Sequence, residues 1–317
     1  MTARFSLIPA NSKIWNESEF IEFLIQHQGQ AIAVDTNREG PDLQRVGVYT
    51  LLEQFGYTAV EIHTPNRLET HPAYKIHYTT PYFFFNTQAA DYTDYHVWTQ
   101  QQVFGCFYNR PLWHRIGLAA QLQYNYPDQS LINVRADPRD PDQRRLFELQ
   151  ELFNMDPASA QCVLAVCNTW PQQLEQADGY TVYNNTTGHT DQLAEFYPDL
   201  LIDIVGETWI NGRTFFATEK TVRPMLMKKP MIVMGAAAHL DYLHQMGFRT
   251  FCDFWSEDYD GYEGRERYVR ILDLVDDLAS KSTQELADMY QAMQPILEHN
   301  YRLLQDKTYT RNTEYIP

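Results

Sequence analysis

The chain has 317 residues, of which 44% are apolar and 21% charged, so it is expected to be a globular protein with one large or two ordinary domains. Its formal net charge of −16 argues against a protein that works mainly by coating nucleic-acid phosphates. Its four cysteines lack paired CxxC spacing, and neither a secretion signal nor an apolar run of about 18 residues is present, so we expect a cytoplasmic protein without a membrane partner.

The N-terminal part of the chain has the pattern of a β-α-β unit. An amphipathic helix is expected over "NESEFIEFLIQHQ", with Asn16 or Ser18 as its cap. Apolar runs at 31–37 and 58–64 predict two strands, and the segment 42–55 between them predicts a helix. Such units build parallel sheets with helices on their faces.

The middle of the chain repeats this alternation more loosely. Its expected elements are strands at 81–86, 103–109 and 130–136 and helices at 112–123 and 141–153. The stretch from about 155 to 195 contains "GYTVYNNTTGHTD", whose Gly, Asn and Thr residues favour turns and loops. A domain boundary is therefore predicted there, between an N-terminal domain of residues 1–190 and a C-terminal domain of residues 191–317.

A second alternating block completes the chain. The expected elements are strands at 199–207, 230–235 and 249–254 and helices at 239–247, 264–279 and 282–305. The fold class is therefore α/β, with two Rossmann-like domains that face each other across a cleft. In open sheets of this kind, ligands bind in the loops at the carboxyl ends of the strands.

The triplet Thr218-Glu219-Lys220 precedes one of these buried strands. Neighbouring residues on a helix do not share a face, so the pair is not predicted to be a simple helix-stabilising ion pair. At a helix start, Lys220 would bind an anion and Glu219 a ribose, while Arg213 and Arg223 add two anion-binding candidates. Together these residues predict a nucleotide-diphosphate pocket. The alternative is that Lys220 and Arg223 are the solvated ends of a short helix.

The segment around this triplet resembles the donor-binding signature of fucosyltransferase-type glycosyltransferases. The shared order is an acidic residue, an aromatic residue, Thr-Glu-Lys, a helix and an apolar strand that ends in Gly. Here these are Glu207, Phe216, Thr218-Glu219-Lys220, "VRPMLMKK" and "PMIVMG". The chain also resembles phage-encoded proteins that share "TEK", "GF.TF" and "E.YD" elements. The spacing after Glu207 is longer than in the fucosyltransferases and Phe216 replaces their usual Tyr, so fucose is not carried over.

The resemblance implies a GT-B architecture in which the C-terminal domain binds a nucleotide sugar such as a UDP- or GDP-sugar. The N-terminal domain would bind the acceptor, a hydroxyl on a glycan or on a modified DNA base. It also implies glycosyl transfer without a metal or other cofactor, because positive side chains and helix ends offset the charge on the departing diphosphate. A carboxylate or histidine of the other domain would take the acceptor's proton.

The loop after the first of the two N-terminal strands is the expected place for that base. Glu39 follows this strand and Gly40 allows close approach of a ligand, with Asp35 as the alternative base. Equally, Glu39 and Asp42 would serve as caps of the following helix.

Two further candidates are less specific. Arg110 and Arg115 in "FYNRPLWHRIG" are candidates for holding the diphosphate from the opposite domain, although Arg115 would also fit the surface of an amphipathic helix. Asp258 and Asp260 form a D-x-D that would hold a divalent metal in a metal-dependent transferase, but helix capping is the preferred interpretation. The remaining alternative is a non-catalytic protein that binds nucleotide sugars.

Overall fold

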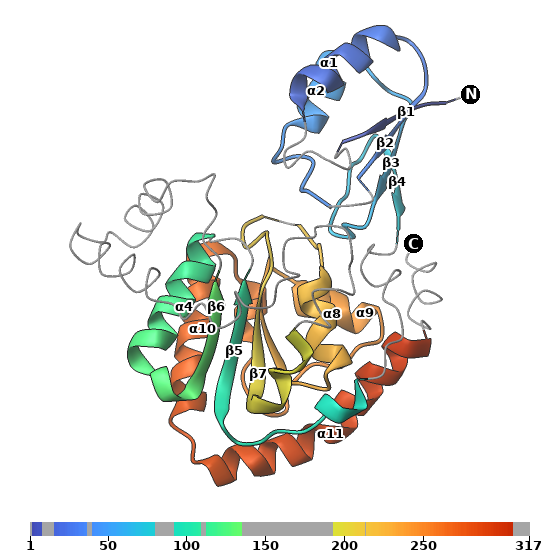
Figure 1. The fold of residues 1–317 in the computed structure, drawn as a ribbon. Coiled ribbons are helices and arrows are strands. Elements are labelled where there is room, and N and C mark those ends of the chain that lie inside the picture. Colours follow the sequence, from blue (N-terminus) through green and yellow to red (C-terminus); the bar gives the residue numbers. More distant parts are fainter. Residues whose placement is uncertain are drawn as a thin grey trace, which may run out of the picture.

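The protein has a mixed α/β fold, and its described residues form two four-stranded parallel sheets, each with its own hydrophobic core (Figure 1). The computed structural model describes residues 2–7, 16–36, 40–79, 92–108, 112–134, 193–212 and 214–306. The strand predicted at 81–86 and the helix predicted at 141–153 lie outside these residues.

The first sheet has the strand order β1-β2-β3-β4. Its strands are β1 (Ala3–Ser6), β2 (Ile32–Asp35), β3 (Val60–Thr64) and β4 (Lys75–Tyr78). The apolar face of the sheet packs against α1 (Glu17–Gln26) and α2 (Val48–Gln54), as Figure 1 shows. The two predicted strands are confirmed as β2 and β3, whereas the short strands β1 and β4 were not predicted.

Local capping decides where the two helices begin. Asn16 caps α1, because its side-chain oxygen accepts the backbone N–H groups of Ser18 and Glu19. The helix predicted at 42–55 is shorter, because residues 43–47 form a turn that ends at Gly47 in the left-handed region with φ 82°.

The second sheet has the strand order β6-β5-β7-β8. Its strands are β5 (Gln102–Tyr108), β6 (Ser130–Val134), β7 (Leu200–Gly206) and β8 (Met231–Met234). Every residue of β7 and β8 is buried, as expected for parallel strands that are covered on both faces. The predicted boundary at residue 190 separates strands that share this sheet, since β5 and β6 precede it and β7 and β8 follow it.

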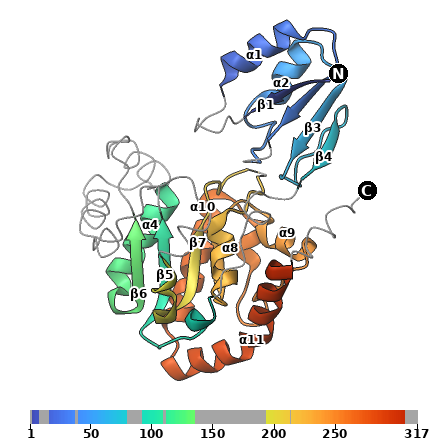
Figure 2. The ribbon, with the colours of Figure 1, turned by 45° about the vertical axis from the view of Figure 1, so that its right-hand side comes forward.

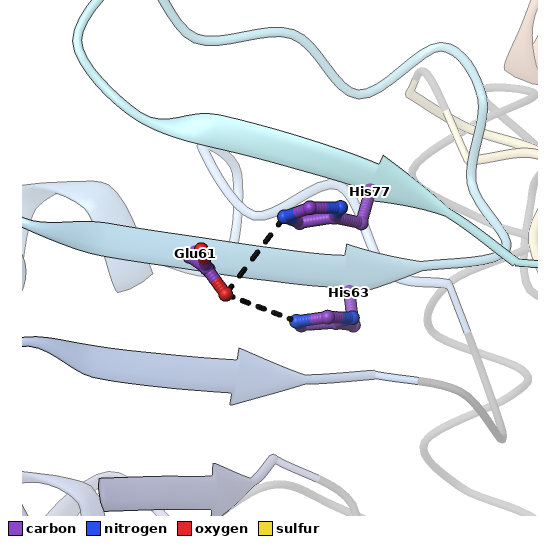
Figure 3. A group of neighbouring side chains, drawn as sticks. All are labelled: Glu61, His63 and His77. Carbon is purple, nitrogen blue, oxygen red and sulfur yellow. Dashed lines mark ion pairs between the residues drawn. The ribbon is translucent and has the colours of Figure 1, made fainter. Parts of the chain in front are cut away.

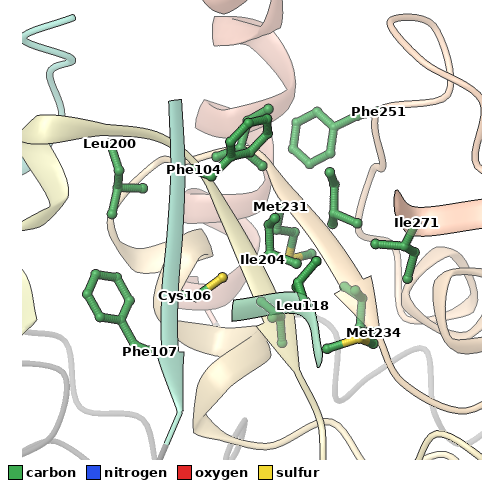
Figure 4. Packing of buried hydrophobic residues seen from close by; sticks show 14 of the residues in the cluster. Phe104, Cys106, Phe107, Leu118, Leu200, Ile204, Met231, Met234, Phe251 and Ile271 are labelled. Carbon is green, nitrogen blue, oxygen red and sulfur yellow. The ribbon is translucent and has the colours of Figure 1, made fainter. Parts of the chain in front are cut away.

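Helices cover both faces of the second sheet. On one face lie α4 (Trp113–Asn125) and α10 (Gly264–Ala279), and on the other α8 (Glu219–Leu226) and α11 (Thr283–Asp306), while α9 (His239–Gln245) follows β8. Figure 4 shows Leu118 of α4 and Ile271 of α10 packed together on one side of β5, opposite Phe107. The two closing helices predicted from the sequence are confirmed to within two residues. No helix in the described part of the chain combines the length and apolar character needed to cross a membrane.

The strand predicted at 249–254 is wrong. This segment is irregular, because Glu257 accepts the backbone N–H of Phe251 (2.8 Å) and the hydroxyl of Thr250 (2.5 Å) and folds the chain into turns. Short 3₁₀ helices occupy Thr93–Tyr95, Pro127–Gln129, Tyr197–Asp199 and Asp258–Gly261.

Loops at the carboxyl ends of strands from both sheets contact each other. Asp42, after β2, donates its backbone N–H to the hydroxyl of Thr214 at 3.0 Å. Phe215, in the loop after β7, donates its backbone N–H to the side-chain oxygen of Asn66, after β3, at 2.9 Å. Figure 2 shows the smaller unit standing over this side of the larger one. The predicted ligand-binding ends of both sheets therefore meet.

Candidate functional site

Glu207 organises the point where β7 ends and α8 begins. Its buried carboxyl group accepts the backbone N–H of Thr218 (2.8 Å), the hydroxyl of Thr218 (2.7 Å) and the hydroxyl of Thr221 (2.7 Å). Thr218 is in turn the N-cap of α8 and accepts the N–H of Lys220. Glu207 thus lies under the helix start, where it positions the cap.

Lys220 and Glu219 converge at this helix start. The Lys220 Nζ atom donates to Glu219 Oε1 at 2.9 Å and to Thr218 Oγ1 at 2.8 Å, and it lies 3.9 Å from Glu207 Oε2. The expectation that adjacent residues would point apart is therefore wrong. The long lysine side chain turns back over the first turn, where no preceding helical turn obstructs it.

The Glu219–Lys220 pair is partly accessible and charged. The side chain of Glu219 is 24% exposed and that of Lys220 is 11% exposed. Although burial raises the pKa of Glu219, the adjacent Lys220 ammonium outweighs it and lowers that pKa to about 2. The site therefore offers an ionised carboxylate beside an ammonium at a helix N-terminus, where anions are also favoured.

His239 lies beneath the same cluster. Its Nε2 atom is 3.5 Å from the hydroxyl of Thr221, and its ring lies 5.0 Å from that of Phe215. Burial lowers the pKa of His239 to about 4, so its imidazole is neutral at neutral pH. Among the described residues, the cluster thus has one ammonium and two carboxyl groups, because the neutral His239 adds no positive charge.

The two described arginines of the predicted site lie in different places. Arg223 is buried against the middle of the sheet, where it donates to Tyr197 (2.5 Å) and pairs with Asp203 (3.4 Å). Arg115 is also buried rather than on the surface of its helix, and a Cβ atom on Gly206 would lie 3.0 Å from its Cγ. Arg115 is therefore at the carboxyl end of β7 close to Glu207, whereas Arg223 is directed into the core.

The remaining predicted site residues contribute no described side chain to this cluster. Arg110, Arg213 and Glu39 lie outside the described residues. Asp35 is the last residue of β2 and its carboxylate pairs with Arg4 at 3.3 Å.

The D-x-D acids hold structural positions. Asp260 accepts the backbone N–H groups at the start of α9 and forms a 2.8 Å ion pair with the fully buried Arg267. Asp258 pairs at 2.6 Å with Arg270, on the outside of α10. The interpretation of Asp260 as a helix cap is confirmed, although the capped helix is α9 and not the predicted one that begins at Gly264.

A pair of matched substitutions tests this assignment. Asp260→Asn is expected to lower the free energy of unfolding by about 2 kcal/mol, because it weakens charged hydrogen bonds to a buried guanidinium and a helix start. Asp258→Asn removes an exposed pair and should change it by less than about 1 kcal/mol. Urea unfolding measures both values, and equal losses would contradict the assignment.

Sequence reasoning missed Thr221, His239 and Asn66. Thr221 lies three residues after the cap Thr218, and His239 is the first residue of α9. Asn66 follows β3 and accepts N–H groups from Leu68 (3.2 Å) and Phe215 (2.9 Å). Only the tertiary structure reveals its contact with Phe215.

Comparisons of the chain with protein-family models, curated proteins and solved structures gave no match. The function is therefore argued from the side chains and their geometry.

Proposed function

We propose that this protein is a glycosyltransferase that moves a sugar from a nucleotide-sugar donor to a hydroxyl acceptor without a metal. The observation that carries the proposal is the Glu219–Lys220 pair at the first turn of α8, held from below by Glu207. This cluster follows the carboxyl end of a central parallel strand, which is where α/β sheets bind ligands.

The two partly accessible groups of the pair suit different parts of a nucleotide sugar. The ionised Glu219 carboxylate only accepts hydrogen bonds, so it suits the two hydroxyl donors of a ribose. The Lys220 ammonium and the α8 N-terminus suit a phosphate. Binding of a diphosphate would draw Lys220 partly away from Glu219, which leaves that carboxylate free to bind the ribose.

A diphosphate needs more positive charge than Lys220 supplies, because two carboxyl groups already surround it. Arg213 and Arg110 are proposed to add this charge, together with Arg115, whose side chain passes Gly206 directly before Glu207. Arg223 is left out of the proposed donor contacts, since Asp203 and Tyr197 already occupy its guanidinium in the core.

The loop contacts between the two sheets support a GT-B arrangement. They join the carboxyl ends of β2 and β3 to the loop that leads into α8. The base is proposed to be Glu39 or Asp35 of the first domain. The acceptor is proposed to be a hydroxyl on a glycan or a modified DNA base.

A non-catalytic binder of nucleotide sugars is the second candidate. One observation favours it: the carboxylate of Asp35 already has a partner within its own sheet, Arg4 at 3.3 Å. The metal-dependent alternative is disfavoured, because arginines occupy Asp258 and Asp260.

Donor binding is expected to depend on Lys220. Calorimetry with UDP- and GDP-sugars should show that Lys220→Ala weakens the donor that wild type binds by about 10- to 150-fold, equivalent to the loss of about 1.5–3 kcal/mol from a charged hydrogen bond. Glu219→Gln should weaken it less, since the amide oxygen still accepts one hydrogen bond.

Lys228→Ala is the matched control, because Lys228 lies just after the other end of α8 and also pairs with a glutamate, Glu298. Equal donor affinity of Lys220→Ala and wild type would contradict the proposal. Sugar transfer that continues in EDTA separates the metal-independent enzyme from the metal-dependent one, and donor binding without transfer identifies the non-catalytic binder.

A further inference from the structure

The exposed face of the first sheet carries charged and imidazole side chains. In a strand, alternate residues share a face, so Glu61 and His63 of β3 lie on the same side. His77 of β4 is the direct partner of His63 in the parallel register. The helices α1 and α2 pack on the opposite, apolar face. Sheet topology therefore brings three side chains with metal-binding atoms together.

The ligand atoms are close to one another. The Nε2 atoms of His63 and His77 each lie 3.8 Å from the same oxygen, Oε2 of Glu61, and all three ligand atoms fall within 4.8 Å of one another. Figure 3 shows the two imidazole rings lying side by side next to this carboxylate. The rings are nearly parallel, with centroids 4.6 Å apart and an interplanar angle of 8°.

The Nε2 atoms of His63 and His77 differ from imidazole nitrogens on a solvated protein surface. Both Nε2 atoms are shielded from solvent, and neither has a hydrogen-bond partner in the described part of the chain. A buried polar nitrogen without a partner is costly, and a metal ion would satisfy both at once. The side chains still allow an ion to enter, with exposed fractions of 46% for Glu61, 34% for His77 and 19% for His63.

We propose that Glu61, His63 and His77 form a binding site for a divalent transition-metal ion of the Zn²⁺ class. Two imidazoles and one carboxylate match the ligands of such ions, and a set of three leaves a coordination position open. Ligand atoms of a tetrahedral zinc site are about 3.4 Å apart and the ion lies near the plane of each imidazole. Binding therefore requires the two stacked rings to tilt toward each other as the present 3.8 Å distances close. Its three ligands come from β3 and β4 of the first sheet, whereas the proposed donor pocket is built from β7 and α8 of the second.

The neighbouring charges have opposite effects on such an ion. Lys75 lies 3.9 Å from Glu61 Oε1 and competes with the ion for the carboxylate. Asp35, the partner of His63 on the other neighbouring strand, adds negative potential that Arg4 partly offsets. The removal of Lys75 should therefore tighten metal binding.

Calorimetric titration of the EDTA-treated, dialysed full chain with Zn²⁺ tests the site. We expect one ion per chain. His63→Ala and His77→Ala should each weaken Zn²⁺ binding on the order of 100-fold, because the loss of a direct ligand costs at least as much as the loss of a residue that only supports a ligand. Glu61→Gln, which keeps the shape of the side chain, should weaken it by at least about 10-fold. Lys75→Met should strengthen it. Each variant is first compared with wild type by thermal unfolding in EDTA.

His27→Ala is the matched control, because His27 lies at the end of α1 and does not belong to the cluster. It should bind Zn²⁺ like wild type. Co²⁺ should produce visible absorption in the wild type that the His77→Ala variant lacks. Absence of stoichiometric Zn²⁺ binding to the wild type would overturn the proposal, as would unchanged affinity in His63→Ala and His77→Ala.

Discussion

Arg223→Met is expected to lower the free energy of unfolding by about 3–5 kcal/mol, the usual loss when one member of a buried ion pair is removed. Asp203 is fully buried in β7, and Arg223 is its cationic partner at 3.4 Å. Of the partners described above, the substitution would leave the Asp203 carboxyl group with only the Tyr197 hydroxyl. Unfolding in guanidinium chloride at pH 7 measures this loss of stability.

The double variant Arg223→Met/Asp203→Leu is the control for this pair. Because it removes both charges from the core, it should regain a large part of the lost stability. A single Arg223→Met variant that keeps wild-type stability but loses donor binding would contradict the structural role and return Arg223 to the ligand site.

His239 is expected to make the protein less stable as the pH falls from about 6.5 to about 4. Burial lowers the pKa of His239 from 6.5 to about 4 in the folded state. Over this range the unfolded chain binds a proton that the folded chain does not, so stability present above pH 6.5 is lost as the pH approaches 4. The shift corresponds to about 3 kcal/mol.

The measurement is the free energy of unfolding at several pH values for wild type and His239→Gln. Wild type should lose about 3 kcal/mol relative to the variant between pH 7 and pH 4, while any constant packing defect of the variant cancels in the pH dependence. Parallel curves for the two proteins would show that His239 does not titrate in this way.

Strong local patterns predicted most of the described elements. The apolar runs of β5, β7 and β8 and the long amphipathic helices α10 and α11 were all expected from the sequence. The segment 249–254 has the aromatic residues of a strand, but Glu257 supplies hydrogen bonds that hold it in turns. Such a contact overrides local preference and has no signal within the segment itself.

Contacts between segments far apart in the chain could not be predicted from the sequence patterns. The prediction separated β5 from β7 because the turn-forming stretch at 155–195 was taken as a domain boundary, and order within a sheet is not visible in a strand pattern. For the same reason no spacing along the chain shows that His77 lies beside His63, which the register of β3 and β4 brings about. In the cluster at the start of α8, Glu207 binds the cap Thr218 and lies 3.9 Å from Lys220, although it is eleven residues before that cap.

The hydrogen bond between Asn66 and Phe215 connects the first sheet to the segment that leads into α8. Phe215 lies three residues before the cap of that helix, and its N–H is held by a side chain that follows β3. Rotation of the first sheet must either break this bond or pull the chain that sets the position of Thr218. If a ligand binds at the helix start as proposed, its binding and the orientation of the first sheet would be thermodynamically linked, and each would bias the other by the same free energy.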